Sequence, residues 1–198
     1  MSAAPALQPN RIPLAEGQRI AWEVRELITA ACDRILTVGS VRRGVPTVKD
    51  VELLVEPHYE TRTSDLFGGA SSFNALEERC AQLRDDGVFI AREINAAWGQ
   101  RLKRFAYAGV QTELFIVLPP SQWGLASVIR TGPADFSHQV VTPKGERCAG
   151  TGRPGLRPRD LVMHDQGFYR GIRLVETPDE QSVFDLLGLP YLEPEKRR

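Results

Sequence analysis

The sequence has no apolar run long enough to cross a membrane. Its N-terminal segment, MSAAPALQPNR, lacks the basic-then-apolar pattern of a secretion signal. We therefore expect a cytoplasmic protein that contacts no membrane. Charge of one sign is also missing, because 25 acidic residues balance 25 basic ones. No overall field draws such a chain to nucleic acid, so any site for a polyanion must be a local patch.

Cysteine and histidine are scarce, at three residues each. The cysteines lie far apart with no C-x-x-C pair, which predicts reduced thiols and excludes a disulfide frame or a zinc site. The histidines lack metal-ligand spacing, so we expect structural or surface roles. Gly145 and Gly150 have P-loop spacing, but no Gly-Lys-Ser/Thr follows, which excludes a Walker motif.

With 198 residues the chain can form one large domain or two small ones. We place the boundary at Pro119–Pro120, which predicts an α/β domain at 1–119 and a smaller mixed domain at 120–198; the carboxylates and the resemblance described below make the first the expected catalytic domain. Periodicity predicts the following elements in the first part: a helix at 14–35, a strand ILTVGS, a strand at 51–55, a helix at 72–84, and a hairpin that turns at Ala108–Gly109.

The second part begins with a short helix for which Ser121 is the expected N-cap. Residues 144–159 hold four glycines, two prolines and five basic residues, which predicts a mobile loop. The last helix is expected to start in a capping box of Thr177 and Glu180 and to end at Gly188.

Some basic and aromatic residues admit two interpretations. The basic loop either follows a phosphate backbone or is simply solvated. The cluster of Arg101, Lys103 and Arg104 either contacts a nucleic-acid strand or is surface charge. For the tryptophans, core packing is the expectation and base stacking the alternative; they are Trp22, Trp98 and Trp123.

Two acids stand at the start of an apolar strand. In the stretch GSVRRGVPTVKDVELLV, Asp50 and Glu52 are two residues apart, so they point to the same face of the strand. Two such carboxylates repel each other unless a cation lies between them, and Mg²⁺ prefers hard oxygen ligands. Glu113, in TELFIVL, is a third acid on a strand that could lie beside the first. Three acids so placed can hold two Mg²⁺ roughly 3.5–4 Å apart.

An isolated D-x-E is most often a charged strand edge or an ion pair, here with Lys49 or Lys103. The turn upstream favours the metal site. If a helix starts at Gly39–Ser40, its amides and dipole attract an anion. Arg42 and Arg43 add charge and a planar fork that suits phosphate. An anion site beside a metal site is typical of nucleoside triphosphate binding.

These motifs resemble the polymerase-beta-type nucleotidyltransferases, the X family of DNA polymerases. The resemblance rests on five ordered segments that span nearly the whole chain: RIP (11–13), GSVRRG with DVE eleven residues after its first glycine, the strand of Glu113, RTG (130–132), and EQSVFDLLGLPYLEPEKR (180–197). It implies an α+β fold: a palm with a mixed sheet and helices on one side, followed by a small C-terminal α/β domain. The chain resembles the shortest members.

The resemblance also implies a role for each matching residue. Asp50, Glu52 and Glu113 would bind two Mg²⁺, for which Mn²⁺ can substitute, and Glu113 would draw the proton from an attacking 3′-hydroxyl. Four residues would bind the triphosphate: Gly39, Ser40, Arg43 and Arg11. Thr131 and Gly132 would line the sugar and base pocket. Arg42 would brace the C-terminal part through an ion pair, and the Gly132–Pro133 bond would be cis.

The chain departs from the family pattern at several positions. Two of the three acids are glutamates where the family usually has aspartate. A basic residue expected two positions before the third acid is Gln111. A base-contacting asparagine corresponds to Ser137, and an aromatic pair corresponds to Ile129–Arg130.

We therefore expect a monomeric, Mg²⁺-dependent nucleotidyltransferase, a minimal X-family DNA polymerase. It would add nucleoside monophosphates to a DNA or RNA 3′-end and release pyrophosphate. Two alternatives stay open at this point. One is a transferase of the same fold that acts on RNA, a small molecule or a protein. The other is a non-catalytic module that binds nucleotide or nucleic acid through a degenerate metal site.

Overall fold

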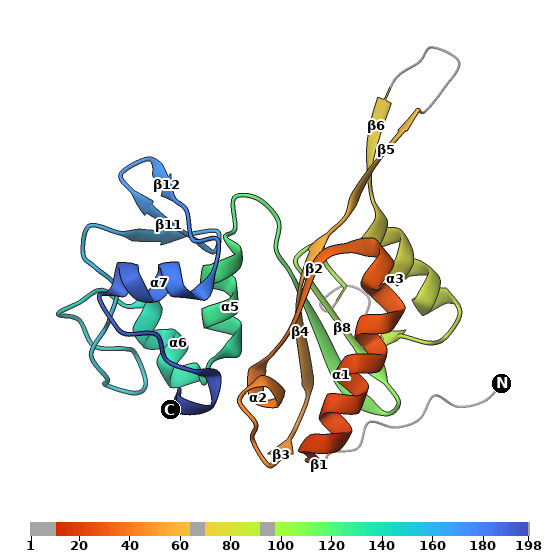
Figure 1. Ribbon diagram of the computed structural model, residues 1–198, viewed down its shortest axis with the longest axis horizontal. Helices are drawn as coiled ribbons and strands as arrows, with labels where there is room; N and C mark the ends of the chain where they lie inside the picture. Colours follow the sequence, from red (N-terminus) through yellow and green to blue (C-terminus); the bar gives the residue numbers. More distant parts are fainter. Residues whose placement is uncertain (1–10, 64–69, 92–97, 198) are drawn as a thin grey trace. The chain divides into compact units, whose positions relative to one another are not determined.

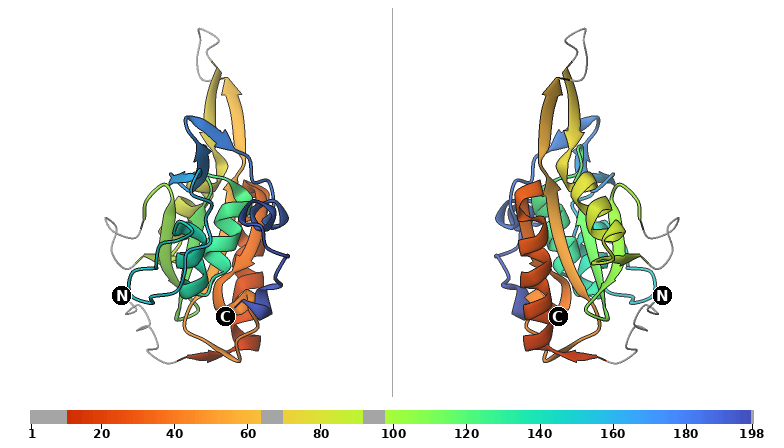
Figure 2. Two further views of the ribbon diagram at one scale, coloured as in Figure 1. Left: turned by 90° about the vertical axis from the view of Figure 1, so that its left-hand side faces the viewer. Right: turned by 90° about the vertical axis from the view of Figure 1, so that its right-hand side faces the viewer.

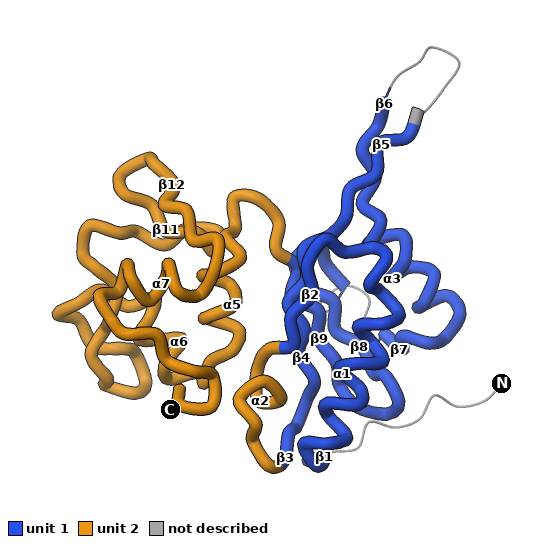
Figure 3. The backbone as a smooth tube through the Cα atoms, in the orientation of Figure 1, with its two compact units in different colours: residues 1–37, 47–116 blue, residues 38–46, 117–198 orange. Residues whose placement is uncertain are grey.

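The computed structural model describes residues 11–63, 70–91 and 98–197. The N-terminal segment used above to predict the location of the protein lies almost entirely outside these ranges. The chain forms two compact units (Figure 3). Unit 1 comprises residues 1–37 and 47–116, and unit 2 comprises residues 38–46 and 117–198. The segment 38–46, which contains the Gly-Ser turn, therefore groups with the C-terminal residues although it interrupts unit 1 in sequence.

Unit 1 is built on a five-stranded sheet with the order β2-β4-β9-β8-β7. Strands β4 and β9 are parallel, whereas β9 with β8 and β8 with β7 are antiparallel, so the sheet is mixed. The strands are β2 (Cys32–Val38), β4 (Val51–Pro57), β7 (Ile90–Ala91), β8 (Leu102–Tyr107) and β9 (Val110–Ile116). Helices α1 (Leu14–Ile28) and α3 (Ala75–Asp85) lie on the same side of it (Figure 1). The predicted α+β class, with a mixed sheet and helices on one side, is confirmed.

The helix side of the sheet holds the apolar core of unit 1. In β4 the alternate residues Val51, Leu53 and Val55 are fully buried, as the period of two requires. Helix α1 packs its apolar stripe against β4. The buried positions of that stripe are Gly17, Ile20, Ala21, Val24 and Ile28.

Two short pairings complete unit 1. Strand β1 (Ile12–Pro13) pairs antiparallel with β3 (Thr47–Val48), which brings the RIP segment next to the residues that precede Asp50. Strands β5 (Tyr59–Thr63) and β6 (Ala70–Asn74) form a hairpin. This hairpin projects away from the sheet in all three views (Figures 1 and 2).

Unit 2 combines helices with a three-stranded antiparallel sheet of the order β10-β11-β12. Its elements are α2 (Gly39–Arg42), α5 (Trp123–Thr131), α6 (Ala134–Val141), β10 (Val162–His164), β11 (Gly167–Arg170), β12 (Arg173–Val175), α7 (Glu180–Leu187) and the 3-10 turn Pro194–Lys196. Residues of α5, α6, α7 and β11 share one apolar core, in which Leu125, Val140 and Leu187 are fully buried.

Several local predictions need correction. The helix expected at 14–35 ends at Ile28, and after the 3-10 turn Thr29–Ala31 the chain enters β2 at Cys32. The apolar residues at 31 and 35 fit both periods, and the neighbouring strand β4 favours the extended form. The helix expected from residue 72 starts at Ala75, because 70–74 pair with β5 and Asn74 caps the helix.

The expected N-caps of two other helices are also wrong. Ser121 does not cap α5; its hydroxyl donates to the carbonyl of Asp165, and Gln122 is the N-cap. The capping box of α7 consists of Asp179 and Ser182, not of Thr177 and Glu180. Gly188 ends α7 as predicted. All three cysteines are free thiols, as predicted.

Trp22 is 62% exposed on α1, so the prediction that it packs in the core is wrong. Trp98 does pack, against the ring of Phe105 and beneath Lys103.

None of the helices in the described ranges combines the length and the apolar character that a membrane span needs.

Candidate functional site

The candidate carboxylates of unit 1 lie on the two central parallel strands. Glu52 on β4 and Glu113 on β9 are direct partners in the register of the sheet. Neighbouring strands are about 4.8 Å apart, so these two side chains leave adjacent backbones at the same level. The prediction that the strand of Glu113 lies beside the strand of Glu52 is therefore confirmed.

Asp50 precedes β4 and is half-buried. Burial raises the pKa of its carboxyl, and the negative charge of Glu113 raises it further. The positive charges of Lys49 and Arg11 lower it in part. Like charges repel, so the ionised form of Glu113 disfavours ionisation of Asp50. The pairing of β4 with β9 thus brings Glu52 and Glu113 to adjacent positions, and Asp50 precedes Glu52 by two residues.

Glu113 has two hydrogen-bond donors that converge on one oxygen. Arg104 Nε donates to Glu113 Oε1 at 2.6 Å, and Gln111 Nε2 donates to the same oxygen at 3.0 Å. Arg104 is the direct partner of Glu113 in the antiparallel pairing of β8 with β9. A two-residue turn at Ala108–Gly109 fixes this register, so the hairpin pattern in the sequence contained the signal for the pair.

Lys103 and Arg104 have different fates although they are consecutive. Lys103 is fully buried, and its Nζ lies 2.7 Å from Glu77 Oε2 of α3 and 3.3 Å from the carbonyl oxygen of Gly99. The expectation of surface charge or of a nucleic-acid contact is wrong for Lys103. Consecutive strand residues point to opposite faces, so Lys103 faces the helices and Arg104 faces the carboxylates.

The carboxylates suit a hard divalent cation in donor type and in strand placement. As their side chains stand, the described ranges contain no group of three or more His, Cys, Asp or Glu that could hold a metal ion. Glu113 Oε1 is directed to Arg104 and Gln111. The carboxylates of Asp50, Glu52 and Glu113 thus suit Mg²⁺ in donor type, but their side chains would have to move closer together to form a metal site.

The Gly-Ser turn belongs to unit 2. Gly39 has a φ of +64°, a conformation that favours glycine. The Ser40 hydroxyl oxygen is buried and has no hydrogen-bond partner among the described residues. A buried hydroxyl without a partner costs free energy, so a ligand that bonded Ser40 would be favoured. Within the described ranges the hydroxyls of Ser127 and Thr177 are unsatisfied in the same way, so this feature is not specific to the turn.

Thr131 and Gly132 are held by the two arginines that follow this turn. Arg42 Nη1 donates to the Thr131 hydroxyl at 2.6 Å, and Arg43 Nη1 donates to the Thr131 carbonyl. Gly132 has a φ of +66°, and a Cβ there would lie 3.1 Å from Arg43 Nη1. The Gly132–Pro133 bond is cis, as predicted. Ser137 donates to the carbonyls of Ile129 and Pro133 and thereby fastens the same bend.

Glu180 anchors this arrangement in the interior of unit 2. It accepts hydrogen bonds from Arg42 at 2.7 and 2.9 Å and from Arg197 at 2.9 and 2.8 Å. Tyr191 donates to the same carboxylate at 3.1 Å. The prediction that Arg42 braces the C-terminal part through an ion pair is confirmed.

The segment 144–159 is held by its own basic side chains. Arg157 donates to the carbonyls of Val141 and Leu161, and Arg159 donates to that of Lys144. Lys144 Nζ donates to the Leu187 carbonyl at 2.8 Å. These bonds fasten the segment to α6 and α7, which argues against the freely mobile loop that its composition predicted.

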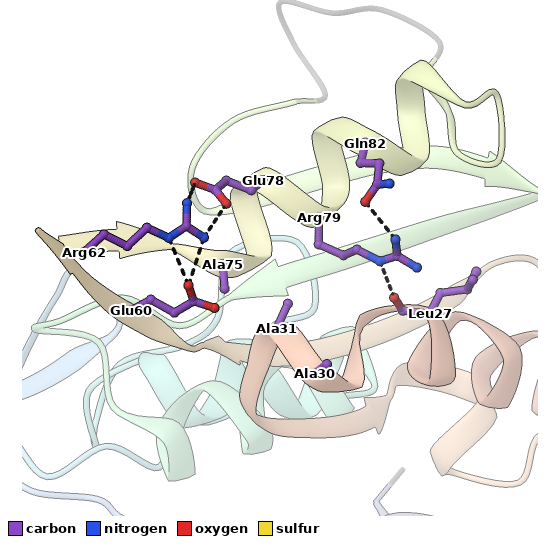
Figure 4. Close-up of a pocket in the computed structure, with 9 residues that line it drawn as sticks. All are labelled: Leu27, Ala30, Ala31, Glu60, Arg62, Ala75, Glu78, Arg79 and Gln82. Carbon is purple, nitrogen blue, oxygen red and sulfur yellow. Dashed lines mark hydrogen bonds and ion pairs between the residues drawn. The ribbon is translucent and has the colours of Figure 1, made fainter. Parts of the chain in front are cut away.

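A groove of about 240 Å³ lies elsewhere in unit 1 (Figure 4). Both arginines that line the groove are hydrogen-bonded within unit 1. Arg62 donates to Glu60 and Glu78, and Arg79 donates to the Leu27 carbonyl and to the Gln82 side chain. None of the three candidate carboxylates lines it. The groove is therefore separate from the site predicted from sequence.

Comparisons with known proteins agree with the motifs. The family description "DNA polymerase beta thumb" matches residues 156–198. The chain is 31% identical to DNA polymerase lambda of Rattus norvegicus over 201 residues, which cover 95% of the chain and 33% of that protein. The chain thus spans about a third of the length of this relative.

Two solved structures of Leishmania infantum polymerase beta resemble the fold. The ternary P/T complex matches with a TM-score of 0.65 and 19% identity, over 96% of this chain and 77% of that chain. The ternary gap complex matches with a TM-score of 0.65 and 19% identity, over 95% and 71%. At this identity the match establishes the fold.

Proposed function

We propose that this chain, an X-family DNA polymerase-like protein, transfers nucleoside monophosphates from a triphosphate to a nucleic-acid 3′-end and releases pyrophosphate. The observation that carries the proposal is the in-register pair of Glu52 and Glu113 on parallel strands. Burial and the negative charge of Glu113 also raise the pKa of Asp50, the acid two residues before Glu52 in the sequence. Phosphoryl transfer needs little covalent chemistry from the protein. It depends on positioning the reacting groups and on stabilising their charge, which carboxylates do when they bind divalent cations.

In this proposal Asp50, Glu52 and Glu113 hold two Mg²⁺, with Mn²⁺ as a substitute. The ions, when bound, would stabilise the charge on the attacking and leaving oxygens. Glu113 would accept the proton of the 3′-hydroxyl, a role in which an ionised carboxylate acts as general base.

The remaining roles belong to residues that bind the nucleotide. Ser40 and Arg43 would bind the triphosphate, with Gly39 allowing close backbone approach and Arg11 adding charge. The unsatisfied hydroxyl of Ser40 supports this assignment. Thr131 and Gly132 would line the sugar and base pocket, and the bonds from Arg42 and Arg43 support a fixed conformation for them.

We propose DNA as the acceptor, because the polymerase beta structures that share the fold are a P/T complex and a gap complex. An RNA acceptor, a monomeric state and a cytoplasmic location stay predictions from the sequence.

One observation favours a second candidate function. Glu113, a glutamate where aspartate is expected, is already paired with Arg104. A carboxylate so engaged is compatible with a module that binds nucleotide or nucleic acid and catalyses nothing.

Primer extension distinguishes the two candidates. The full chain is incubated with labelled deoxynucleoside triphosphates, a gapped primer–template and Mg²⁺ or Mn²⁺. We expect extension that is lost in Asp50→Ala and reduced in Ser40→Ala, while circular dichroism shows both variants folded. Binding of the gapped DNA without extension in either metal would instead identify a binding module, and extension by Asp50→Ala would overturn the metal assignment.

A further inference from the structure

We propose that Arg104 is a positioning residue for Glu113: it holds Oε1 of the carboxylate, with Gln111, so that Oε2 is presented to the divalent cation bound by Asp50. This inference rests on the proposed function, since it concerns the same carboxylates. It assigns a role to a residue on β8, outside every segment that the sequence motifs identify.

The geometry restricts Glu113 strongly. Its side chain is 9% exposed, and two donors from two different strands meet at one oxygen, at 2.6 and 3.0 Å. Arg104 arrives from the partner position on β8, and Gln111 lies two residues before Glu113 on β9, on the same face. Neither donor bonds Oε2. A carboxylate fixed by two bonds on one side has a defined direction for its other oxygen.

A glutamate needs this support more than an aspartate would. It has one more rotatable bond, so its carboxylate samples more positions, and fixing it costs more side-chain entropy. Gln111 is neutral, so the positive charge in this group of three comes from Arg104.

Two effects of Arg104 on metal binding have opposite signs. As a nearby cation it repels Mg²⁺ or Mn²⁺, so its removal alone would tighten binding. As a positioning residue it directs a ligand, so its removal would weaken binding; loss of such an outer partner typically lowers metal affinity roughly 10- to 100-fold. The sign of the change therefore reports which role Arg104 has.

The test measures Mn²⁺ binding to the full chain by electron paramagnetic resonance, without nucleotide or DNA. Asp50→Ala first identifies the fraction of binding that depends on the carboxylates. We expect Arg104→Leu to weaken that fraction by roughly tenfold or more, and Arg104→Lys, which restores the charge and one donor, to recover part of it.

Arg34→Leu is the matched control. Arg34 Nε donates to Glu56 Oε2 at 2.6 Å between the neighbouring strands β2 and β4, but that pair is exposed. Arg34→Leu removes the same charge and the same type of hydrogen bond as Arg104→Leu. We expect its Mn²⁺ affinity to stay within about twofold of the wild type, because screened surface charges contribute little to the binding free energy.

Gln111→Leu separates position from charge. It removes one donor from Glu113 Oε1 and leaves the net charge unchanged, so only the positioning role predicts weaker Mn²⁺ binding. This variant also serves if Arg104→Leu proves unfolded by circular dichroism.

The outcomes are distinct. If Asp50-dependent binding is present and Arg104→Leu binds equally or more tightly, or Gln111→Leu is unchanged, the inference is overturned while the proposed function stands. If the wild type shows no Asp50-dependent binding, the proposed metal chemistry is overturned and the role of Arg104 falls with it.

Discussion

Arg197 and Glu180 form a two-bond ion pair inside unit 2: Nη1 donates to Oε1 at 2.9 Å and Nη2 donates to Oε2 at 2.8 Å. The side chain of Arg197 has no exposed surface, and its guanidinium carbon lies 5.2 Å from the centre of the Phe184 ring. Arg42, on α2, donates to the same carboxylate. One buried acid thus links α2, α7 and the C-terminal segment, and through Arg42 it reaches Thr131.

We expect Arg197→Met to reduce the free energy of unfolding by about 3 kcal/mol, because breaking a buried pair leaves Glu180 with one cation fewer. The matched control is Arg170→Met, since Arg170 lies 2.7 Å from Asp160 in an exposed pair. That change should cost less than about 1 kcal/mol. Urea unfolding at neutral pH measures both values. Equal losses would contradict the expectation that the buried pair stabilises the protein more than the exposed pair.

We expect the ionisation of Glu180 to contribute to the pH dependence of the unfolding free energy. Burial would raise its pKa, but hydrogen bonds from Arg197 and then Arg42 outweigh burial, so the pKa lies below its ordinary value of 4.5. The unfolded chain therefore takes up this proton first as pH falls. Stability from the ionised carboxylate is present above about pH 4.5 and is lost as pH falls below it.

Chemical unfolding of the wild type and of Glu180→Gln between pH 3 and pH 7 checks this. The difference in unfolding free energy between the two should be largest at pH 7 and should shrink below about pH 4.5. A constant difference across that range would mean that Glu180 is not ionised in the folded protein.

Asp50→Asn should stabilise the metal-free protein and, under the proposed function, abolish nucleotide transfer. Burial and the charge of Glu113 raise the pKa of Asp50 above its ordinary value of 3.8, so the ionised carboxylate costs stability at neutral pH. We therefore expect the unfolding temperature at pH 7 to rise above that of the wild type.

Differential scanning calorimetry with a chelator present measures this rise. Asp85→Asn is the control, because Asp85 is an exposed acid paired with Arg84 and its neutralisation relieves no repulsion from Glu113. An unchanged or lower unfolding temperature in Asp50→Asn would show that burial and the like charge of Glu113 do not destabilise the ionised Asp50.

Gly124 allows α5 to pass close to the segment before α7. Its amide donates to the Thr177 carbonyl at 2.7 Å, and a Cβ at this position would lie 2.0 Å from the Asp179 carbonyl oxygen. Because the obstacle is backbone, Gly124→Ala should cost about 3 kcal/mol or more of stability. At Gly99 the nearest atom to a built Cβ is 3.8 Å away, so Gly99→Ala should be nearly neutral. Thermal unfolding of the two variants makes the comparison, and similar melting curves would refute the close approach.

Local signals predicted a large part of the fold. The turn at Ala108–Gly109 lies between two β-rich runs, and both its partners and its bend are contained in a short stretch of chain, so the β8–β9 hairpin followed from sequence. Gly188 ended its helix for an equally local reason. The acids at 50, 52 and 113 were identified because a carboxylate at the edge of an apolar run is unusual in any tertiary fold.

The misplaced caps have a tertiary cause. Thr177, expected to cap α7, instead accepts a hydrogen bond at its carbonyl from the Gly124 amide and donates its own amide to Gln122 Oε1. Both partners lie at the start of α5. Asp179 then takes the cap. Several residues near a helix start can cap it in isolation, and the contact with a distant element selects among them.

The sequence by itself determined which residues face the same way along each strand, because side chains alternate with a period of two. It therefore determined that Lys103 and Arg104 point to opposite sides. Only the tertiary structure decided that β9 lies parallel beside β4, with Glu113 opposite Glu52, and that Arg104 meets a buried carboxylate while Lys103 meets α3. Strand alternation is a property of the local backbone, whereas the choice of neighbour depends on burying apolar surface contributed by segments far apart in the chain.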